Sequence, residues 1–309
     1  MKKALLLSGF CALLALSLSA LEIVNAQGIS KQFDNAILHK HETTELKTSN
    51  EKDGQIRLGT WQGFRFDNWL EQQNLGSFNN IRFESPDRYL VNLSKEEFDS
   101  KEIWLVTAQD GTPFENNMLR LIIPSMREMY WIRDLNRVVL ENFVPLPPPT
   151  RFYLMKPFLE GLKLQKEPTL FVNIEGWLFK DIVSQLSDKD KNSVVLYSRD
   201  GLKQNLEYPL HLEGAVLEKT TKNTFNLKSP QIPGGMWIKD IVYLQCDKTA
   251  LIELGSLSSL LDLAKLFGWD SNPDLQFRIT REGGDEVFSF GDALAEPQVF
   301  EGAIYFELF

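Results

Sequence analysis

The segment Gly63-Phe64-Arg65-Phe66-Asp67-Asn68-Trp69-Leu70 is matched 113 positions later by Gly176-Trp177-Leu178-Phe179-Lys180-Asp181-Ile182-Val183. The same offset aligns residues 81–87 (IRFESPD) with residues 194–200 (VVLYSRD) and keeps the apolar, Ser and Asp positions in register. Self-similarity at a fixed spacing indicates a repeated structural unit. The sequence therefore predicts two degenerate copies of one module.

A third pair of matching segments follows at an offset of 106, in which residues 131–135 (WIRDL) align with residues 237–241 (WIKDI). The smaller offset indicates a net loop deletion in the second copy. Each copy is predicted to hold an amphipathic helix, an alternating strand, a strand that ends in Pro, and a final strand after the Trp. We therefore expect a β-rich α+β fold, with the copies at roughly 55–142 and 169–247.

The N-terminus has the pattern of a secretory signal peptide, since Lys2 and Lys3 precede an apolar stretch over residues 4–18. We expect cleavage after Ala26 rather than after Ala20, which would place the bulky Leu18 at the −3 position. The alternative is an uncleaved anchor, for which this stretch is short. No other stretch is apolar enough to span a membrane, so an extracytoplasmic location, periplasmic or secreted, is predicted.

Charge and cysteine content narrow the function further. Without residues 1–26 the chain keeps 31 basic and 41 acidic residues, a net charge of −10. Nucleic acid and anionic lipid are therefore poor partners. Cys246 is then the only cysteine, which excludes a disulfide framework and a metal site built on several cysteines.

The segment between the copies, residues 144–150 (VPLPPPT), cannot form a helix or a central strand because its prolines lack the backbone donor. Residues 39–55 are polar and are predicted to be a loop. The tail, residues 249–309, is either a partial third copy or the strands that complete the second, and Gly283-Gly284-Asp285 in it is a turn signal between two predicted strands. The predicted organisation is a signal peptide (1–26), a first module (27–143), a Pro-rich connector (144–168), and a second module with a C-terminal extension (169–309).

Five segments of the first copy also follow one another in a recognisable order. They are residues 61–70 (WQGFRFDNWL), 85–89 (SPDRY), 109–111 (QDG), 119–124 (LRLIIP) and 131–138 (WIRDLNRV). In this order they resemble the molybdopterin-binding oxidoreductase domain of the sulfite oxidase type, and in particular its exported relatives that lack the metal-binding cysteine. The resemblance implies a sulfite-oxidase-like module for the first copy and, more weakly, for the second.

In catalytic members of that family, a cysteine before the tryptophan motif ligates molybdenum. Residues 27–60 contain no cysteine, and Cys246 matches no ligand position. The resemblance thus implies the fold but argues against the chemistry, so no cofactor and no catalytic residue are expected. The alternative is a periplasmic molybdopterin-dependent oxidoreductase with a non-cysteine metal ligand. Its pterin phosphate would need a basic pocket, for which the available cations are Arg120, Arg127, Arg133 and Arg137.

Strand alternation would place Trp131 and Arg133 on one face, and likewise Trp237 and Lys239. An aromatic ring beside a cation can anchor an anionic or planar ligand. With Arg137, these residues are the predicted ligand-binding set. The alternative is that each Trp fills the core of its own copy.

His39 and His41 are weak candidates for a zinc or copper site, because a His-x-His segment in an extended conformation places both rings on one side. A solvated polar segment is the simpler interpretation, and no metal is expected. The predicted function is an exported, non-catalytic binding or interaction protein. Its partner would be a small molecule or an envelope protein, and its ligand cleft would lie near the Pro-rich connector.

Overall fold

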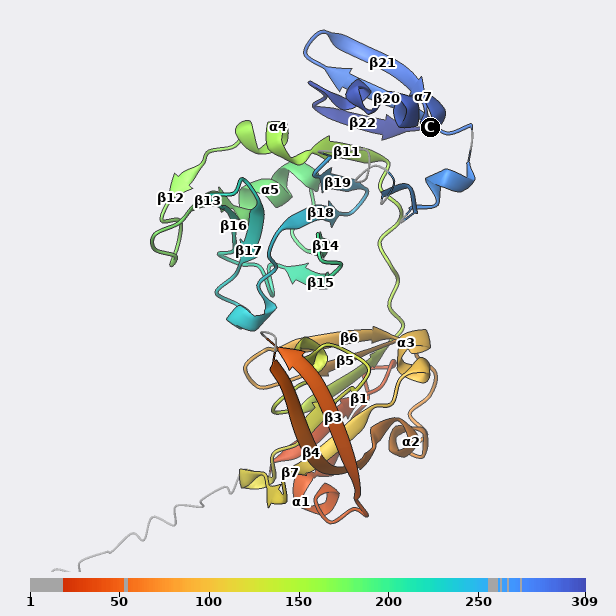
Figure 1. The fold of residues 1–309 in the computed structure, drawn as a ribbon, viewed down its shortest axis with the longest axis vertical. Coiled ribbons are helices and arrows are strands. Elements are labelled where there is room, and N and C mark those ends of the chain that lie inside the picture. The colour runs from red at the N-terminus through yellow and green to blue at the C-terminus, as the bar shows by residue number, and fades with distance from the viewer. Residues whose placement is uncertain (1–18, 53–54, 255–260, 262, 266, 273) are drawn as a thin grey trace, which may run out of the picture. The chain divides into compact units, whose positions relative to one another are not determined.

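The computed structural model describes residues 19–52, 55–254, 261, 263–265, 267–272 and 274–309. The chain divides into two compact units, one formed by the residues up to Pro86 and by Leu90–Asn142, the other by Asp87–Tyr89 and Phe143–Phe309. Both units are built from β-sheets and short helices, a β-rich α+β architecture (Figure 1). Within the described residues, no helix combines the length and apolar character that a membrane span needs.

The first sheet of the first unit is five-stranded, in the order β2-β1-β10-β5-β6. Its strand β1 pairs in parallel with β10 and antiparallel with β2. Alternation along β1 buries Leu21 and Ile23 completely. The strands are β1 (Ala20–Val24), β2 (Ser30–Asp34), β5 (Asn80–Glu84), β6 (Leu90–Ser94) and β10 (Arg137–Glu141).

This sheet changes the predicted N-terminal boundary of the first module. Cleavage after Ala26 would remove β1, which is an inner strand with a partner on each side. The first unit thus includes residues before position 27. The sequence concealed this because Leu21 and Ile23 continue the preceding apolar stretch without a break.

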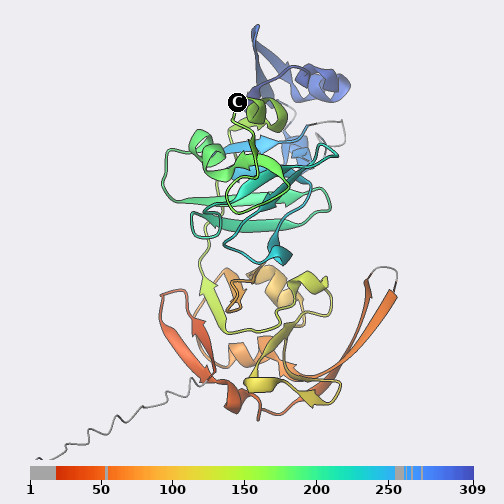
Figure 2. The same ribbon diagram turned by 90° about the vertical axis from the view of Figure 1, so that its left-hand side faces the viewer.

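The second sheet of the first unit runs β3-β4-β7-β8, and β9 pairs with β7. The prediction of a loop over residues 39–55 was wrong, because most of this segment is strand β3, which pairs with β4 to form a long ribbon (Figure 2). The ribbon is polar because much of it faces solvent, and even Leu58 is 80% exposed. The strands are β3 (Thr44–Lys52), β4 (Gln55–Arg65), β7 (Trp104–Gln109), β8 (Thr112–Pro113) and β9 (Arg120–Ile122).

Helix α2 directly follows β4, as the first matching segment predicted. Its buried residues Phe66, Trp69 and Leu70 have the i, i+3, i+4 spacing of one helix face. The backbone N–H of Phe66 donates to the carbonyl of Ile103 (2.7 Å), which fixes the start of the helix against the sheet. The helical segments of this unit are α1 (Asn35–Leu38), α2 (Phe66–Glu71), α3 (Lys95–Ser100), and the 3-10 turns η1 (Glu115–Asn117) and η2 (Glu128–Tyr130).

The large sheet of the second unit has eight strands in the order β15-β14-β18-β19-β11-β22-β20-β21. Strand β11 lies inside this sheet, parallel to β19 and antiparallel to β22. The segment predicted as a connector over 144–168 is therefore only partly one. Its Pro-rich part has no helix or strand, but β11 and the helix after it belong to the second unit. The strands are β11 (Arg151–Leu154), β14 (Asn192–Ser198), β15 (Lys203–Tyr208), β18 (Ile241–Cys246), β19 (Thr249–Ile252), β20 (Gln276–Arg281), β21 (Gly284–Ser289) and β22 (Tyr305–Leu308).

The tail contributes strands to this large sheet rather than standing apart from it. Strand β22 pairs with β11, and the hairpin predicted at Gly283-Gly284 joins β20 to β21. The rings of Phe152 and Phe306 stack with centroids 4.9 Å apart in the core beneath. The C-terminal strands thus complete the second unit.

A smaller sheet of the second unit runs β12-β13-β16-β17. Helix α5 follows β13 just as α2 follows β4, and it buries Phe179, Ile182, Val183 and Leu186. Its strands are β12 (Gln165–Lys166), β13 (Glu175–Leu178), β16 (Val216–Lys219) and β17 (Phe225–Lys228), and the helical segments of the unit include α4 (Met155–Glu160), α5 (Phe179–Leu186), α7 (Phe290–Ala295), η3 (Gly234–Met236), η4 (Trp269–Ser271) and η5 (Pro297–Phe300).

Two glycines of the first matching segment occupy equivalent tight positions. A Cβ on Gly63 would lie 2.3 Å from the carbonyl oxygen of Leu105, and a Cβ on Gly176 would lie 2.6 Å from that of Leu217. Each glycine thus allows two neighbouring strands to approach closely. The close approach explains why glycine stands at both positions.

Candidate functional site

Trp131 is half-buried in the first unit. Its indole Nε1 donates to the carbonyl of Ile123 (2.8 Å), and its ring meets Trp61 edge-on with centroids 6.0 Å apart. The neighbouring Ile132 forms an isolated bridge with Leu121. The ring therefore holds the segment before β10 against β9.

Trp237 has the same arrangement in the second unit. Its Nε1 donates to the carbonyl of Ser229 (3.0 Å), and Ile238 bridges Leu227. Phe171 meets the ring edge-on at 5.7 Å, and the Lys228 ammonium lies 5.8 Å from its centroid. Both tryptophans are held by packing and by a backbone hydrogen bond.

The strand on which the Trp–cation face was predicted starts later than expected. The strand predicted to start after each Trp begins only at Arg137 and Ile241, so strict strand alternation does not apply to residues 131–134 and 237–240. Arg133 and Lys239 are both exposed. The wrong assumption was that the strand begins at the Trp, whereas a 3-10 turn precedes each Trp.

Arg137 belongs to a network of ion pairs on the first sheet. Its Nε donates to Glu22 (2.9 Å) and its Nη1 to Glu84 (3.1 Å). Burial opposes its charge, but the two carboxylates outweigh burial and raise the pKa of Arg137. The side chain joins β10 to its two neighbouring strands, so its charge is already compensated.

Arg120 lies near Arg133 in the first unit. Its guanidinium lies 4.2 Å from the ring centroid of Phe114, and its Nη1 donates to Gln109 (3.3 Å). Burial, and secondly the charge of Arg133, lower the pKa of Arg120. These arginines and Arg137 do not line either of the two cavities described below.

The two histidine candidates lie at the end of α1 rather than in an extended segment. The Nε2 of His39 is 3.0 Å from the carbonyl of Met118, and the His41 ring lies against Phe64 with centroids 4.4 Å apart. Among the described residues, no group of three or more His, Cys, Asp or Glu side chains is placed to hold a metal ion.

Cys246 is fully buried at the end of β18. Burial, with a smaller contribution from Asp247, raises the pKa of its thiol to about 12. The side chain is therefore a neutral thiol at physiological pH, and metal ligation requires the thiolate.

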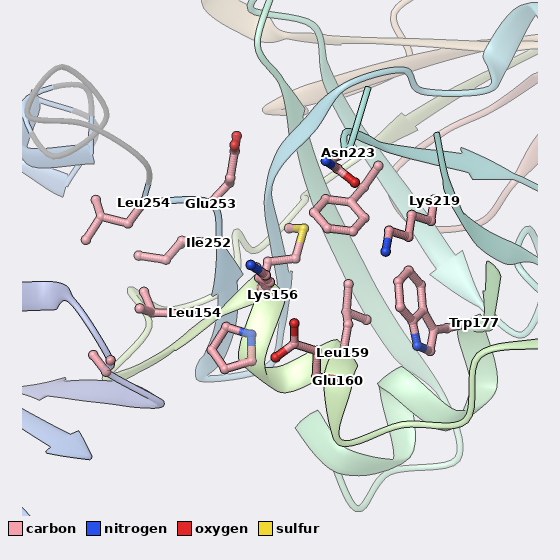
Figure 3. Close-up of a pocket in the computed structure, with 15 residues that line it drawn as sticks. Leu154, Lys156, Leu159, Glu160, Trp177, Lys219, Asn223, Ile252, Glu253 and Leu254 are labelled. Atoms are coloured by element: carbon pink, nitrogen blue, oxygen red, sulfur yellow. The ribbon is translucent and has the colours of Figure 1, made fainter. Parts of the chain in front are cut away.

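The second unit contains a cavity of about 760 Å³, which lies within the usual range of small-molecule sites. Three parts of the chain enclose it: α4, the smaller sheet, and the residues at the end of β19 (Figure 3). Gly302 and Ala303 also line it. The lining consists of Leu154, Met155, Lys156, Pro157, Leu159, Glu160, Trp177, Lys219, Asn223, Phe225, Ile252, Glu253, Leu254, Gly302 and Ala303.

The sheet wall follows from strand register. Trp177 on β13 is opposite Leu217 on β16, and Lys219 on the same strand is opposite Phe225 on β17. Directly paired residues, and residues two apart on one strand, share a face. Trp177, Lys219 and Phe225 therefore share one face of the smaller sheet, and the rings of Trp177 and Phe225 lie 6.0 Å apart.

The helical wall is α4, which starts directly after β11. Pro157 is tolerated because it stands in the first turn, where the backbone N–H has no intrahelical partner. Met155 and Leu159, four residues apart, are both buried. Lys156 and Glu160 are exposed and lie along the cavity rim.

One polar atom at the cavity wall has no protein partner. Trp177 is only 6% exposed, yet its Nε1 forms no hydrogen bond in the structure. Buried indole N–H groups usually find a partner, as those of Trp131 and Trp237 do. Trp177 is thus the one tryptophan of the three whose indole donor is buried without a partner.

Sequence reasoning identified little of this cavity. Trp177 was noticed as part of the repeated segment, but Lys219 and the residues of α4 carried no signal. The α4 residues lie within the segment predicted as a connector, whose Pro-rich start made the whole region look structureless. A second cavity, of about 300 Å³, lies in the first unit and is mostly apolar, with Phe78, Phe98 and Leu140 among its lining residues.

Comparison with known proteins adds little. No protein-family model matches the chain, and no curated protein matches it. Among solved structures, the chain is similar to the sulfane dehydrogenase SoxCD from Paracoccus pantotrophus, with 10% sequence identity, a TM-score of 0.35, and coverage of 76% of this chain and 77% of that one. A likeness this distant does not establish a shared fold or activity.

Proposed function

We propose that this chain is an exported, non-catalytic protein that binds a small organic molecule in the cavity between α4 and the smaller sheet of its second unit. The observation that carries the proposal is this cavity of about 760 Å³, walled by apolar side chains with a few polar groups at its edges. Sites of this composition are typical of small-molecule binding.

We further propose that the two units are degenerate copies of a sulfite-oxidase-like module. Support comes from equivalent interactions at the offsets found in the sequence. The hydrogen bonds from Trp131 to Ile123 and from Trp237 to Ser229 are 106 positions apart at both ends. The tight glycines Gly63 and Gly176 are 113 apart.

We also propose that the chain holds no molybdenum cofactor. Cys246 is a buried thiol whose raised pKa keeps it protonated, so it is unsuited to ligate a metal. Of the four cations considered for a pterin phosphate, Arg137 is already paired with Glu22 and Glu84. No observation favours an oxidoreductase over a binding protein.

The test of binding uses three probes with one apolar body and different head groups: 4-phenylbutyrate, 4-phenylbutanol and 4-phenylbutylamine. At least one is expected to bind the wild-type chain with a stoichiometry of one by isothermal titration calorimetry. Leu254→Trp places a large ring at the half-buried cavity wall and should abolish that binding. The matched control Leu58→Trp, at an exposed position of the first unit, should not.

Binding that persists in a folded Leu254→Trp variant would place the site elsewhere. The proposed function would be overturned if the folded Leu254→Trp variant bound all three probes with wild-type affinity. It would also be overturned if the wild type bound none of them. Export is tested separately by fractionating the native host cells, where a chain confined to the cytoplasm would contradict it.

A further inference from the structure

Two lysines and two glutamates line the cavity. The carboxylate of Glu253 is paired with Arg199, which also donates to Asp240 (3.0 Å). Glu253 is therefore partly compensated from outside the cavity.

On α4, Lys156 and Glu160 are four residues apart. Side chains at this spacing are neighbours on a helix surface and attract each other when their charges are opposite. They form no ion pair within 4 Å in the structure, yet together they contribute no net charge. The helical wall is therefore close to neutral.

Lys219 is the fourth charged residue of the cavity lining. It is exposed and forms no ion pair among the described residues, whereas the adjacent Glu218 is paired with Lys228 (2.8 Å) on the opposite face of the strand. In Figure 3 the Lys219 ammonium lies beside the six-membered ring of Trp177, and the indole nitrogen is at the opposite end of that side chain. Lys219 is therefore a local positive charge in a lining whose formal charges, two lysines against two glutamates, sum to zero.

The other unpaired donor on this sheet face is buried rather than open to the cavity. The Nε1–H of Trp177 has no partner and almost no accessible surface, so it offers no contact to a ligand in the structure as it stands. An ammonium without an ion-pair partner is satisfied by an anionic acceptor such as a carboxylate. The remaining walls, among them Met155, Leu159 and Ile252, are apolar and suit a hydrocarbon or aromatic body.

We propose that the cavity binds an amphipathic organic anion, an apolar body that carries a carboxylate, with the anionic head at Lys219 and the body against Trp177, Phe225 and α4. The inference rests on the proposed function and deepens it, because it names the class of ligand. Phe225 and Leu159 bury the body, and Lys219 selects the charge of the head.

The experiment compares the affinities of the three phenylbutyl probes by calorimetry on the full chain. The carboxylate is expected to bind at least about tenfold more tightly than the alcohol, a ratio equivalent to one well-placed charge contact. The amine is expected to bind most weakly. Lys219→Gln keeps most of the side-chain length and should weaken carboxylate binding about tenfold while it leaves alcohol binding within about twofold.

Lys180→Gln is the matched control, since Lys180 is an exposed lysine of the same unit outside the cavity lining. It makes the same change in net charge and should leave carboxylate binding within about twofold. An equal effect of the two substitutions would mean that only the overall charge matters and would overturn the assignment of Lys219.

Other outcomes separate this inference from the proposed function. If the alcohol or the amine binds as tightly as the carboxylate, and Leu254→Trp abolishes binding, the cavity is a site but not one for anions. If no probe binds at millimolar concentration, both proposals fail. Should Leu254→Trp not fold, the indole N–H resonance of Trp177, assigned with Trp177→Phe, provides the readout. A shift of that resonance on carboxylate binding supports the inference, and an unchanged resonance contradicts it.

Discussion

The indole Nε1 of Trp237 donates a hydrogen bond of 3.0 Å to the carbonyl oxygen of Ser229, eight residues earlier in the chain. Trp177, in the same unit, is more deeply buried but donates to nothing. The two tryptophans thus differ in whether the indole donor is bonded, and a bonded donor stabilises the fold whereas an unbonded buried one costs free energy.

Replacing each of these tryptophans by phenylalanine removes the donor and shortens the ring. Trp237→Phe leaves the Ser229 carbonyl without its partner, whereas Trp177→Phe removes a donor that had none. We expect Trp237→Phe to lower the free energy of unfolding by at least about 1 kcal/mol more than Trp177→Phe. Urea denaturation checks this, and equal losses would show that the hydrogen bond contributes nothing.

The tight glycine of β13 should not tolerate a side chain. A Cβ on Gly176 would lie 2.6 Å from a backbone carbonyl, so Gly176→Ala must push two strands apart and should destabilise the second unit by about 2–3 kcal/mol. Gly283→Ala is the control, because nothing lies within 4 Å of its added Cβ. The midpoints of thermal unfolding of the two variants are compared. Similar midpoints would contradict the close approach of the two strands at Gly176.

The buried thiol of Cys246 is expected to make the folded protein less stable at alkaline pH. The thiol pKa is raised from 9.0 to about 12 in the folded chain, so the folded state keeps its proton where the unfolded state has lost it. The stabilisation is complete below about pH 9 and is lost as the pH rises towards 12. Burial also raises the pKa of Tyr243, which acts in the same direction.

The measurement for Cys246 is the free energy of unfolding between pH 8 and pH 11, in a Cys11→Ala background and in the same background with Cys246→Ala. The decline with pH should be shallower without the thiol. In the native protein at pH 8, Cys246 should also resist alkylation by iodoacetamide until urea unfolds the chain. Rapid alkylation of the folded protein would show that the thiol is accessible.

Arg137 should behave as a structural residue rather than a ligand contact. Arg137→Met leaves Glu22 and Glu84 close together without their shared cation, so we expect a loss of about 1 kcal/mol in unfolding free energy, limited by solvent screening. Lys239→Met, at an exposed position without an ion pair among the described residues, should change stability by less than about 0.5 kcal/mol. Urea titrations of both variants distinguish these roles, and a greater loss from Lys239→Met would reverse the assignment.

Strand β1 gives a prediction about processing. If the chain is exported, its mature N-terminus should lie at or before Leu21, since β1 is an inner strand that buries Leu21 and Ile23. A chain that starts at Gln27 should unfold at a lower urea concentration than one that starts at Ala20. N-terminal sequencing of the exported protein checks the site, and a mature chain that begins at Gln27 would show that β1 is dispensable.

The sequence by itself determined the elements whose signal is local. The spacing of buried residues in α2 and α5 is a helical period that can be read along a few residues, and the hairpin at Gly283-Gly284 follows from turn chemistry. The Pro-rich run before β11 lacks donors, and so it was correctly predicted to be neither helix nor strand. In each case the physical cause lies within a short stretch of chain.

Only the tertiary structure decided the roles of β1, β3 and β11. Leu21 and Ile23 look like the end of an apolar leader until β10 is placed beside them, and the polar segment of β3 is a strand because it pairs with β4. The cavity depends even more on long-range order, since it joins α4, β13, β16 and the end of β19. Local periodicity cannot specify such a convergence, because strand pairing and crossover, not the neighbouring residues, bring Lys219 and Trp177 to the same face.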